Sequence, residues 1–224
     1  MTRGKETSLT ARNLEMGERY EFRMRCKFRD GWGIWGEKIT AMTRMRLPKD
    51  SAWKECPDNV DGNRKYSVDM KNPRIATKIN GGYYCTIIGN TPLPLNTVTS
   101  WNIKVLKSYN DGHNICIGIA PTNINQNTCN YYNCGWHFNC YWSALYSGSP
   151  HKYSWKEYGP RKRNGEYVHT GDNVGVVMDT AKGELSFVLN GVNHGVAYEG
   201  IPLDKPLVPC VLLECEGDSV ELVI

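Results

Sequence analysis

Short runs of alternating apolar and polar residues dominate this 224-residue sequence and constrain its fold more than any other feature. Glycine, asparagine, aspartate and proline separate the runs, and a helical period of apolar residues is almost absent. Alternation places successive side chains on opposite faces of a strand, so each run supplies one apolar face. Many short strands at this spacing predict an all-β protein built as an antiparallel sandwich or barrel.

Particular runs add detail to this prediction. Residues 115–120 alternate isoleucine with Cys116, Gly118 and Ala120, and small residues on one face indicate close packing of a second layer or a neighbouring strand. Asn190-Gly191 directly follows an apolar run and suits a tight hairpin, because both positions tolerate positive φ. Other predicted strands contain the alternating residues Tyr66, Val68 and Met70, and Trp101, Ile103 and Val105; the last two cover residues 208–213 and 220–224.

Charge is unevenly distributed along the chain. Residues 1–50 hold 12 Lys+Arg and 7 Asp+Glu, whereas residues 51–224 hold 15 and 16, so the net charges are +5 and −1. A charged stretch with Pro48 inside it lies between the two parts, and we expect a boundary near residue 50. The predicted organisation is an N-terminal segment at 1–46, a linker at 47–59 and a domain at 60–224.

The domain at 60–224 resembles the SPRY domain family. Its motifs follow the family in order and rough spacing: WNIKV at 101–105, IGIA at 117–120, CGW at 134–136, GDNVGV at 171–176, GELSF at 183–187, NG at 190–191, GVAY at 195–198 and PLVP at 206–209. The resemblance implies two curved antiparallel sheets whose edge loops bind other proteins. It also implies a recognition module that is not itself an enzyme.

The N-terminal segment is similar to the last strands of a fibronectin type III domain. LEMGERYEFRMR at 14–25 looks like the tyrosine corner and the following strand, and DGWGIWG at 30–36 looks like the next loop and strand start. We expect one strand at 20–27, with Tyr20, Phe22, Met24 and Cys26 on its buried face. Arg23 and Arg25 then project beside Trp32 and Trp35, where guanidinium and indole groups can stack. Because half a sandwich leaves its apolar face uncovered, either this segment packs on the other domain or the true chain begins upstream; the second is favoured.

One group of residues imitates a metal site. Cys129, Cys134, His137 and Cys140 offer four nitrogen or sulfur ligands, but their spacing matches no standard zinc finger. In a strand, Cys134, Trp136, Phe138 and Cys140 point one way and His137 the other. The sequence therefore predicts no metal site, and no cofactor.

A basic and aromatic cluster imitates a nucleic-acid site. It consists of Lys156 and residues 161–163, together with Tyr153, Trp155, Tyr158 and Tyr167. Turn residues bracket the charges, and the net charge of −1 leaves residues 51–224 without a broad positive surface. A solvated turn is the favoured interpretation, so nucleic acid is not expected as a partner.

Aromatic residues in turn-rich sequence are the candidate partner-binding residues: Tyr131, Tyr132, Trp142, Tyr146 and Trp155. Tyrosine and tryptophan bring a large contact area with few rotatable bonds, although they could instead cover the sandwich edge. By resemblance, residues 136–146 correspond to a segment that lines the binding surface in family members. Trp101, Trp136 and Phe187 are predicted core residues.

The function expected from these observations is non-catalytic binding of a peptide or protein surface. The five histidines are scattered, and no nucleophile motif or phosphate-binding glycine loop is present, so an enzyme is not expected. A carbohydrate-binding β-sandwich is the alternative, since loop aromatics can stack on sugar rings. The sequence shows no secretory signal and no bilayer-length apolar run, and several of its nine cysteines (Cys26, Cys85, Cys116 and Cys210) lie in apolar stretches. These features predict a cytoplasmic protein without membrane contact.

Overall fold

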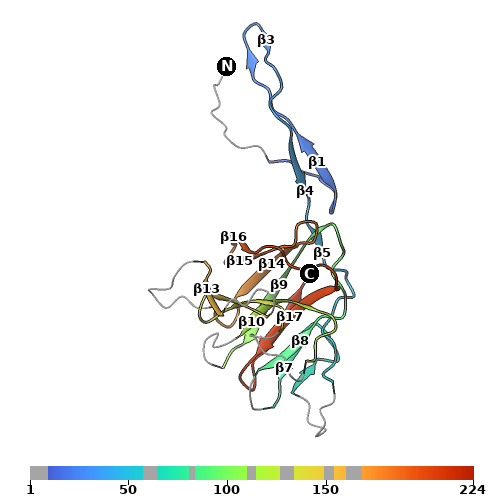
Figure 1. The fold of residues 1–224 in the computed structure, drawn as a ribbon, viewed down its shortest axis with the longest axis vertical. Helices are drawn as coiled ribbons and strands as arrows, with labels where there is room; N and C mark the ends of the chain where they lie inside the picture. The colour runs from blue at the N-terminus through green and yellow to red at the C-terminus, as the bar shows by residue number, and fades with distance from the viewer. Residues whose placement is uncertain are drawn as a thin grey trace. The chain divides into compact units, whose positions relative to one another are not determined.

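The computed structural model describes residues 10–57, 65–80, 84–109, 115–126, 134–148, 154–159 and 168–224, with the side chains of residues 154 and 155 left out. It divides into two compact units, Met1–Met45 and Arg46–Ile224. The described residues are all-β, with antiparallel strand pairs throughout (Figure 1). None of them forms a helix of the length and apolarity needed to cross a membrane. β5 (Met45–Arg46) lies at the division between the units.

The larger unit is a sandwich of two antiparallel sheets, which confirms the predicted fold class. Within the described residues, the six-stranded sheet has the order β13 (Ser154–Glu157), β12 (Ala144–Ser147), β11 (Trp136–Asn139), β10 (Cys116–Pro121), β17 (Leu207–Leu213) and β8 (Cys85–Ile88). The second sheet has the order β16 (Val192–Tyr198), β15 (Glu184–Leu189), β14 (Asn173–Asp179), β9 (Val98–Lys107), β18 (Ser219–Val223), β7 (Ile75–Lys78) and β6 (Tyr66–Val68).

The main core lies between the two sheets. Ile117 and Phe138 from the six-stranded sheet and Ile103 and Phe187 from the second sheet are fully buried members of one apolar cluster. Phe138 and Phe187 lie with ring centroids 5.5 Å apart, so the two inner faces meet directly. Trp101, Trp136 and Phe187 are buried as predicted. Alternation in the sequence therefore identifies these three residues of the inner faces correctly.

The segment predicted as a linker belongs largely to this sandwich. Leu47, Trp53 and Cys56 are buried in the main core, and the Trp53 amide donates to Pro73 O at 3.0 Å. The charges and Pro48 suggested a linker, but burying the large apolar area of an indole outweighs that local composition. Met70, predicted to continue the alternation of β6, is instead 99% exposed because the strand ends at Val68.

The smaller unit contains four short strands among its described residues. β1 (Arg19–Phe22) pairs with β4 (Ile39–Met42), and β2 (Lys27–Phe28) pairs with β3 (Gly31–Trp32). The single strand predicted at 20–27 is therefore wrong, because the chain leaves the regular ladder after Phe22 to face a glycine-rich segment. Met24 and Cys26, predicted to be buried, are exposed, since no second layer of described residues covers them.

The predicted Asn190-Gly191 hairpin is present between β15 and β16. Asn190 has φ +49° and Gly191 has φ +80°, as a type I′ turn requires. The two strands then depart from regular pairing twice, between Leu185 and Ser186 and between Ser186 and Val188. These irregularities bend the edge of the second sheet next to the aromatic residues described below.

A second apolar cluster covers the outer face of the six-stranded sheet. It consists of Ile88, Cys116, Ala120, Val208, Cys210 and Leu212. Gly118 lies in the same alternating set, and a Cβ there would fall 1.9 Å from Trp136 O. The predicted close approach of a neighbouring strand on the small-residue face is therefore confirmed, because β11 leaves no space for a side chain.

His137 lies in this outer cluster. It is fully buried, its Nε2 lies 3.4 Å from Cys210 Sγ, and its Nδ1 has no hydrogen-bond partner among the described residues. Burial lowers the pKa of His137 from 6.5 to about 3, because the charged imidazolium would lose its hydration. The histidine is therefore neutral in the folded protein at ordinary pH.

Two tyrosine hydroxyls join the sheets at the end where β11–β13 meet β15 and β16. Tyr198 of β16 donates to His137 O at 2.7 Å and Tyr146 O at 2.9 Å, both in the six-stranded sheet. Tyr158, just after β13, donates to Gly195 O at 2.7 Å and Phe187 O at 3.2 Å and accepts from Phe187 N at 3.0 Å. Each sheet thus sends one tyrosine into the backbone of the other, an arrangement that we call the tyrosine clamp.

We expect Tyr158→Phe and Tyr198→Phe each to lower the free energy of unfolding by about 1–3 kcal/mol, because buried backbone groups lose their hydroxyl partner. Urea unfolding of the full chain measures the change. Tyr109→Phe is the matched control: its side chain is exposed, so its effect should stay within about 0.5 kcal/mol. Equal effects of all three substitutions would show that the clamp does not stabilise the sandwich.

We also expect His137 to make the fold sensitive to acid. The unfolded chain binds a proton at this side chain near pH 6.5, whereas the folded chain does so only near pH 3. The contribution of neutral His137 to the free energy of unfolding is therefore fully present above pH 6.5. It is lost as the pH falls toward 3, at a limiting slope of about 1.4 kcal/mol per pH unit. The measurement is urea unfolding from pH 7 to pH 5, above the titration range of most carboxylates. His137→Gln should have a shallower slope than the wild type, and an unchanged slope would contradict the assignment.

Candidate functional site

The tight turn between β11 and β12 presents Trp142 to solvent. Asn139 is buried beneath the turn, where its Oδ1 accepts from Tyr141 N at 3.0 Å and Trp142 N at 2.9 Å. Its Nδ2 donates to Cys116 Sγ at 3.4 Å, so the amide is anchored in the outer cluster. The Trp142 side chain remains 48% exposed, with its ring edge-on to Tyr141 at 4.6 Å between centroids. The backbone of the turn is thus fixed from below while its indole faces outward.

The tyrosine clamp supports this turn from the side. Tyr158 N donates to Ser143 O at 2.9 Å, and Ser143 itself adopts φ +48°. Because the Tyr158 hydroxyl bonds Phe187 and Gly195 of the second sheet, the turn is connected through one residue to both layers. Its ring also lies edge-on to His194 of β16, at 6.2 Å between centroids. The result is a rigid end of the sandwich with an exposed indole upon it.

Two edge strands flank the same end. β13 is the last strand of the six-stranded sheet in the described residues, and Lys156 and Glu157 on it are exposed. β16 is the edge of the second sheet, and Val192 and Val196 on it are exposed apolar residues. We call the surface formed by the Trp142 turn, β13 and β16 the clamped edge; the strands β13 and β16 are labelled in Figure 1. It offers one aromatic anchor, apolar side chains and strand edges carrying polar backbone groups.

The predicted partner-binding residues have different outcomes. Trp142 is on the surface, whereas Tyr146 is only 5% exposed. Tyr146 pairs with His137 across β11 and β12, so its side chain shares the covered outer face and lies beneath the surface. Trp155 belongs to β13, but its side chain falls outside the described part of the structure, as do Tyr131 and Tyr132 entirely.

Sequence reasoning missed Val192 and Val196 as parts of this surface. The available signal was their position directly after the Asn190-Gly191 hairpin, at the end of a chain of paired strands. Alternation alone did not reveal them, because the irregular pairing of β15 with β16 changes which side chains face inward.

Among the described residues, the side chains of the cysteine and histidine group do not point toward one common site. Trp136, Phe138 and Cys140 belong to the core between the sheets, whereas His137 points to the outer cluster, as the alternation predicts. Cys129 lies outside the described residues. The described part of the chain holds no group of three or more histidine, cysteine or acidic residues that could bind a metal ion.

Two buried thiols of the six-stranded sheet, Cys116 on β10 and Cys85 on β8, have little chemical reactivity. Burial raises the pKa of Cys85 and of Cys116 to about 12, so each is a protonated thiol and a weak nucleophile at neutral pH. No disulfide joins the described cysteines.

The structure describes only part of the basic and aromatic cluster. Lys156 is exposed, whereas Tyr158 is buried and holds the clamp. Tyr153, Tyr167 and residues 161–163 lie outside the described residues. Tyr158 therefore acts in packing and has no face available to stack on a base.

The model of the SPRY domain matches residues 98–224. The structure is similar to the SPRY domain of human HERC1, with a TM-score of 0.58 and 18% identity over 71% of this chain and 92% of that chain. A second human SPRY domain gives a TM-score of 0.54 at 17% identity, over 71% and 95% of the two chains.

The PSpry domain of TRIM65 is also similar, with a TM-score of 0.50 and 11% identity over 72% of this chain and 85% of that chain. At these identities the likeness is one of fold. A search of curated proteins returned no match. The match to the domain model covers more than half of the sequence and contains the clamped edge. The chain therefore belongs to the SPRY domain family.

Proposed function

We propose that this chain binds a peptide or a protein surface through the clamped edge, without catalysing a reaction. SPRY domains are generally protein–protein interaction modules, which makes this the expected class of function. The observation that carries the proposal for this chain is Trp142, a half-exposed indole on a turn fixed by buried Asn139. A large aromatic surface held in place before binding loses little conformational entropy when a partner covers it.

The other parts of the clamped edge suit a protein ligand. Val192 and Val196 on β16 are exposed apolar residues, and β13 and β16, the edge strands among the described residues, offer backbone donors and acceptors to an extended segment. Lys156 and Glu157 supply charges of both signs, so the surface does not select strongly for an acidic or a basic partner. Orientation then depends on hydrogen bonds around the aromatic anchor.

A carbohydrate ligand is the second candidate, because an exposed indole can also stack on a sugar ring. Trp142 is again the residue concerned, and polar groups that hydrogen-bond sugar hydroxyls would have to lie beside it. The apolar Val192 and Val196 favour the protein ligand over this alternative. The cytoplasm remains the proposed compartment, and neither nucleic acid nor a membrane is proposed as the partner of the SPRY domain.

The smaller unit supports the proposal of a fibronectin type III-like segment. Tyr20 Oη accepts from Glu15 N at 2.8 Å, a bond from the tyrosine back to the backbone just upstream. The tyrosine corner of immunoglobulin-like sandwiches has this connection. Pairing of β1 with β4 and of β2 with β3 agrees with a fragment of such a sandwich.

We expect Trp142→Ala to weaken peptide binding by about thirtyfold or more, because losing a central aromatic anchor typically costs about 2 kcal/mol. Peptides selected by the wild-type chain from a random display library would be measured by calorimetry against wild type and variant. The thermal midpoint of the variant should stay close to that of the wild type, since the indole is half-exposed.

Met70→Ala serves as the control, because Met70 is an exposed apolar residue next to β6, at the opposite edge of the second sheet from β16. It should leave binding unchanged. Selected peptides that bind the Trp142 variant with wild-type affinity would refute the site. Sugar binding on a glycan array, together with failure of every peptide selection, would favour the carbohydrate alternative.

A further inference from the structure

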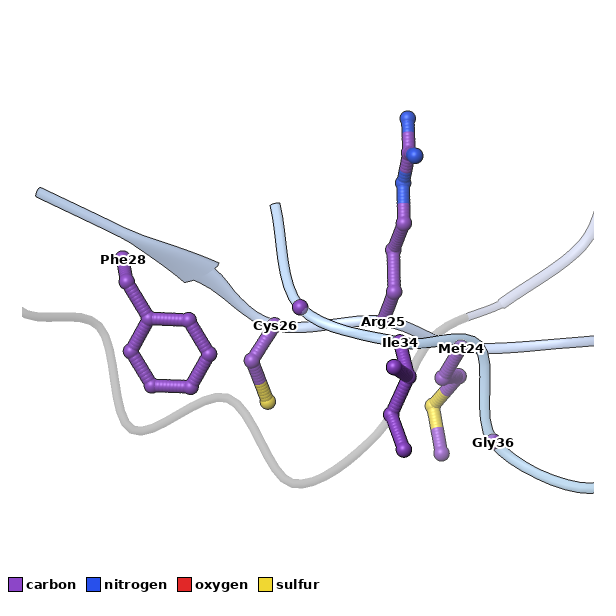
Figure 2. A pocket seen from close by; sticks show the side chains of 7 residues that line it. Met24, Arg25, Cys26, Phe28, Ile34 and Gly36 are labelled. Carbon is purple, nitrogen blue, oxygen red and sulfur yellow. The ribbon is translucent and has the colours of Figure 1, made fainter. Parts of the chain in front are cut away.

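The chain between Met24 and Gly36 forms a ribbon with two chemically different faces. Gly33 N donates to Cys26 O at 2.8 Å and Gly36 N donates to Met24 O at 2.7 Å, which holds the two sides together. Met24, Cys26, Phe28 and Ile34 line an apolar groove of ≈ 410 Å³ on one face. Figure 2 shows the Arg25 side chain extending away from the side on which Met24 and Cys26 lie. The charged end of Arg25 is therefore on the face opposite the groove.

On that opposite face, two indoles hold the Arg25 guanidinium. Its Cζ lies 4.3 Å from the ring centroid of Trp32 and 4.5 Å from that of Trp35. Lys27 Nζ lies 5.4 Å from the centroid of the same Trp32 ring. Stacking fixes the plane of a guanidinium and leaves the N–H groups at its edge free to donate. Trp32 and Trp35 are 55% and 52% exposed, so a ligand can reach this edge.

The two cations make no ion pair in the described structure. Neither Arg25 nor Lys27 makes an ion pair or hydrogen bond with another described residue through its side chain. Glu21, a carboxylate on the preceding strand, is paired with Lys38 at 2.8 Å and is thus already neutralised. Two positive charges beside one indole repel each other, and an anion bound at the edge of that ring would be attracted by both.

We propose that Arg25 and Lys27, held by Trp32 and Trp35, form a binding site for a phosphate monoester group. Its two negative charges match the two cations, which have no ion-pair partner among the described residues. Its three terminal oxygens can accept two parallel bonds from the guanidinium fork and a third from the ammonium group. A carboxylate supplies one charge and two oxygens and satisfies only the fork. The site lies in the smaller unit and is independent of the function proposed for the SPRY domain.

The test uses the full chain and phenyl phosphate as the probe, at low ionic strength, because exposed charges are screened by salt. The readout is nuclear magnetic resonance of the Arg25 Nε–H group and of the Trp32 and Trp35 indole N–H groups. Arg25→Lys, Trp32→Phe and Trp35→Phe assign these signals. We expect all three to shift saturably with phenyl phosphate, with millimolar affinity, and benzoate to bind at least fivefold more weakly.

Lys27→Gln is the decisive variant, because it removes one charge and leaves Arg25 stacked between its indoles. It should weaken phenyl phosphate at least threefold. Arg23→Gln is the matched control: Arg23 lies on the same segment, carries the same charge and makes no cation–π contact among those the structure describes. Its effect should be less than 1.5-fold. Equal losses in the two variants, equal binding of benzoate, or no shift of the Arg25 signal would each overturn the site.

A second pair of measurements identifies the source of the phosphate group. A phosphotyrosine peptide and its unphosphorylated form represent a modified protein, and vesicles with and without phosphatidic acid represent a lipid headgroup. We expect the phosphorylated peptide, the vesicles with phosphatidic acid, or both to bind. This binding should be lost in the Lys27→Gln variant and retained in the Arg23→Gln variant. Binding that ignores the phosphate in both pairs would count against a phosphate monoester site.

Discussion

The reciprocal hydrogen bonds of Tyr158 and Tyr198 determine how the two sheets of the sandwich meet at the clamped edge. Apolar packing between sheets is non-directional, so it brings the layers together without fixing their register. A buried hydroxyl has a directional requirement and must find a backbone partner. Tyr198 finds His137 O and Tyr146 O, and Tyr158 finds Gly195 O and Phe187 O. Since each tyrosine comes from one sheet and bonds the other, sliding of the layers would break both sets of bonds.

The clamp also gives a physical reason for the irregular pairing of β15 with β16. Pairing of β15 with β16 shifts around Ser186, next to the Phe187 backbone groups that bond Tyr158. In a regular ladder, the Phe187 N–H and C=O groups would bond the neighbouring strand. The bulge frees them from that pairing, and the Tyr158 hydroxyl supplies their hydrogen-bond partner instead. The same tyrosine bonds Ser143 O, so the geometry of the Trp142 turn depends on an irregularity in the opposite sheet.

Alternation in the sequence predicts which face of its own strand a side chain occupies. It identifies Trp101, Trp136 and Phe187 as core residues, and it places His137 on the face opposite Phe138. It fails for features that arise between strands. The burial of Tyr146 follows from its pairing with His137, and the roles of Tyr158 and Tyr198 follow from contacts between sheets. Neither relation is encoded in local periodicity, whereas the exposure of Trp142 follows from its own turn and could be predicted.

The smaller unit shows the same distinction in its charges. Strand parity treats Arg23 and Arg25 alike, and both were expected to stack on Trp32 and Trp35. Within the described residues only Arg25 does so, and Lys27, which parity places on the same face, contacts Trp32 as well. The regular strand ends at Phe22, so the ribbon that carries the indoles begins beyond Arg23. Parity therefore identifies the face of a side chain, but the position at which a strand ends decides which of its cations the indoles can hold.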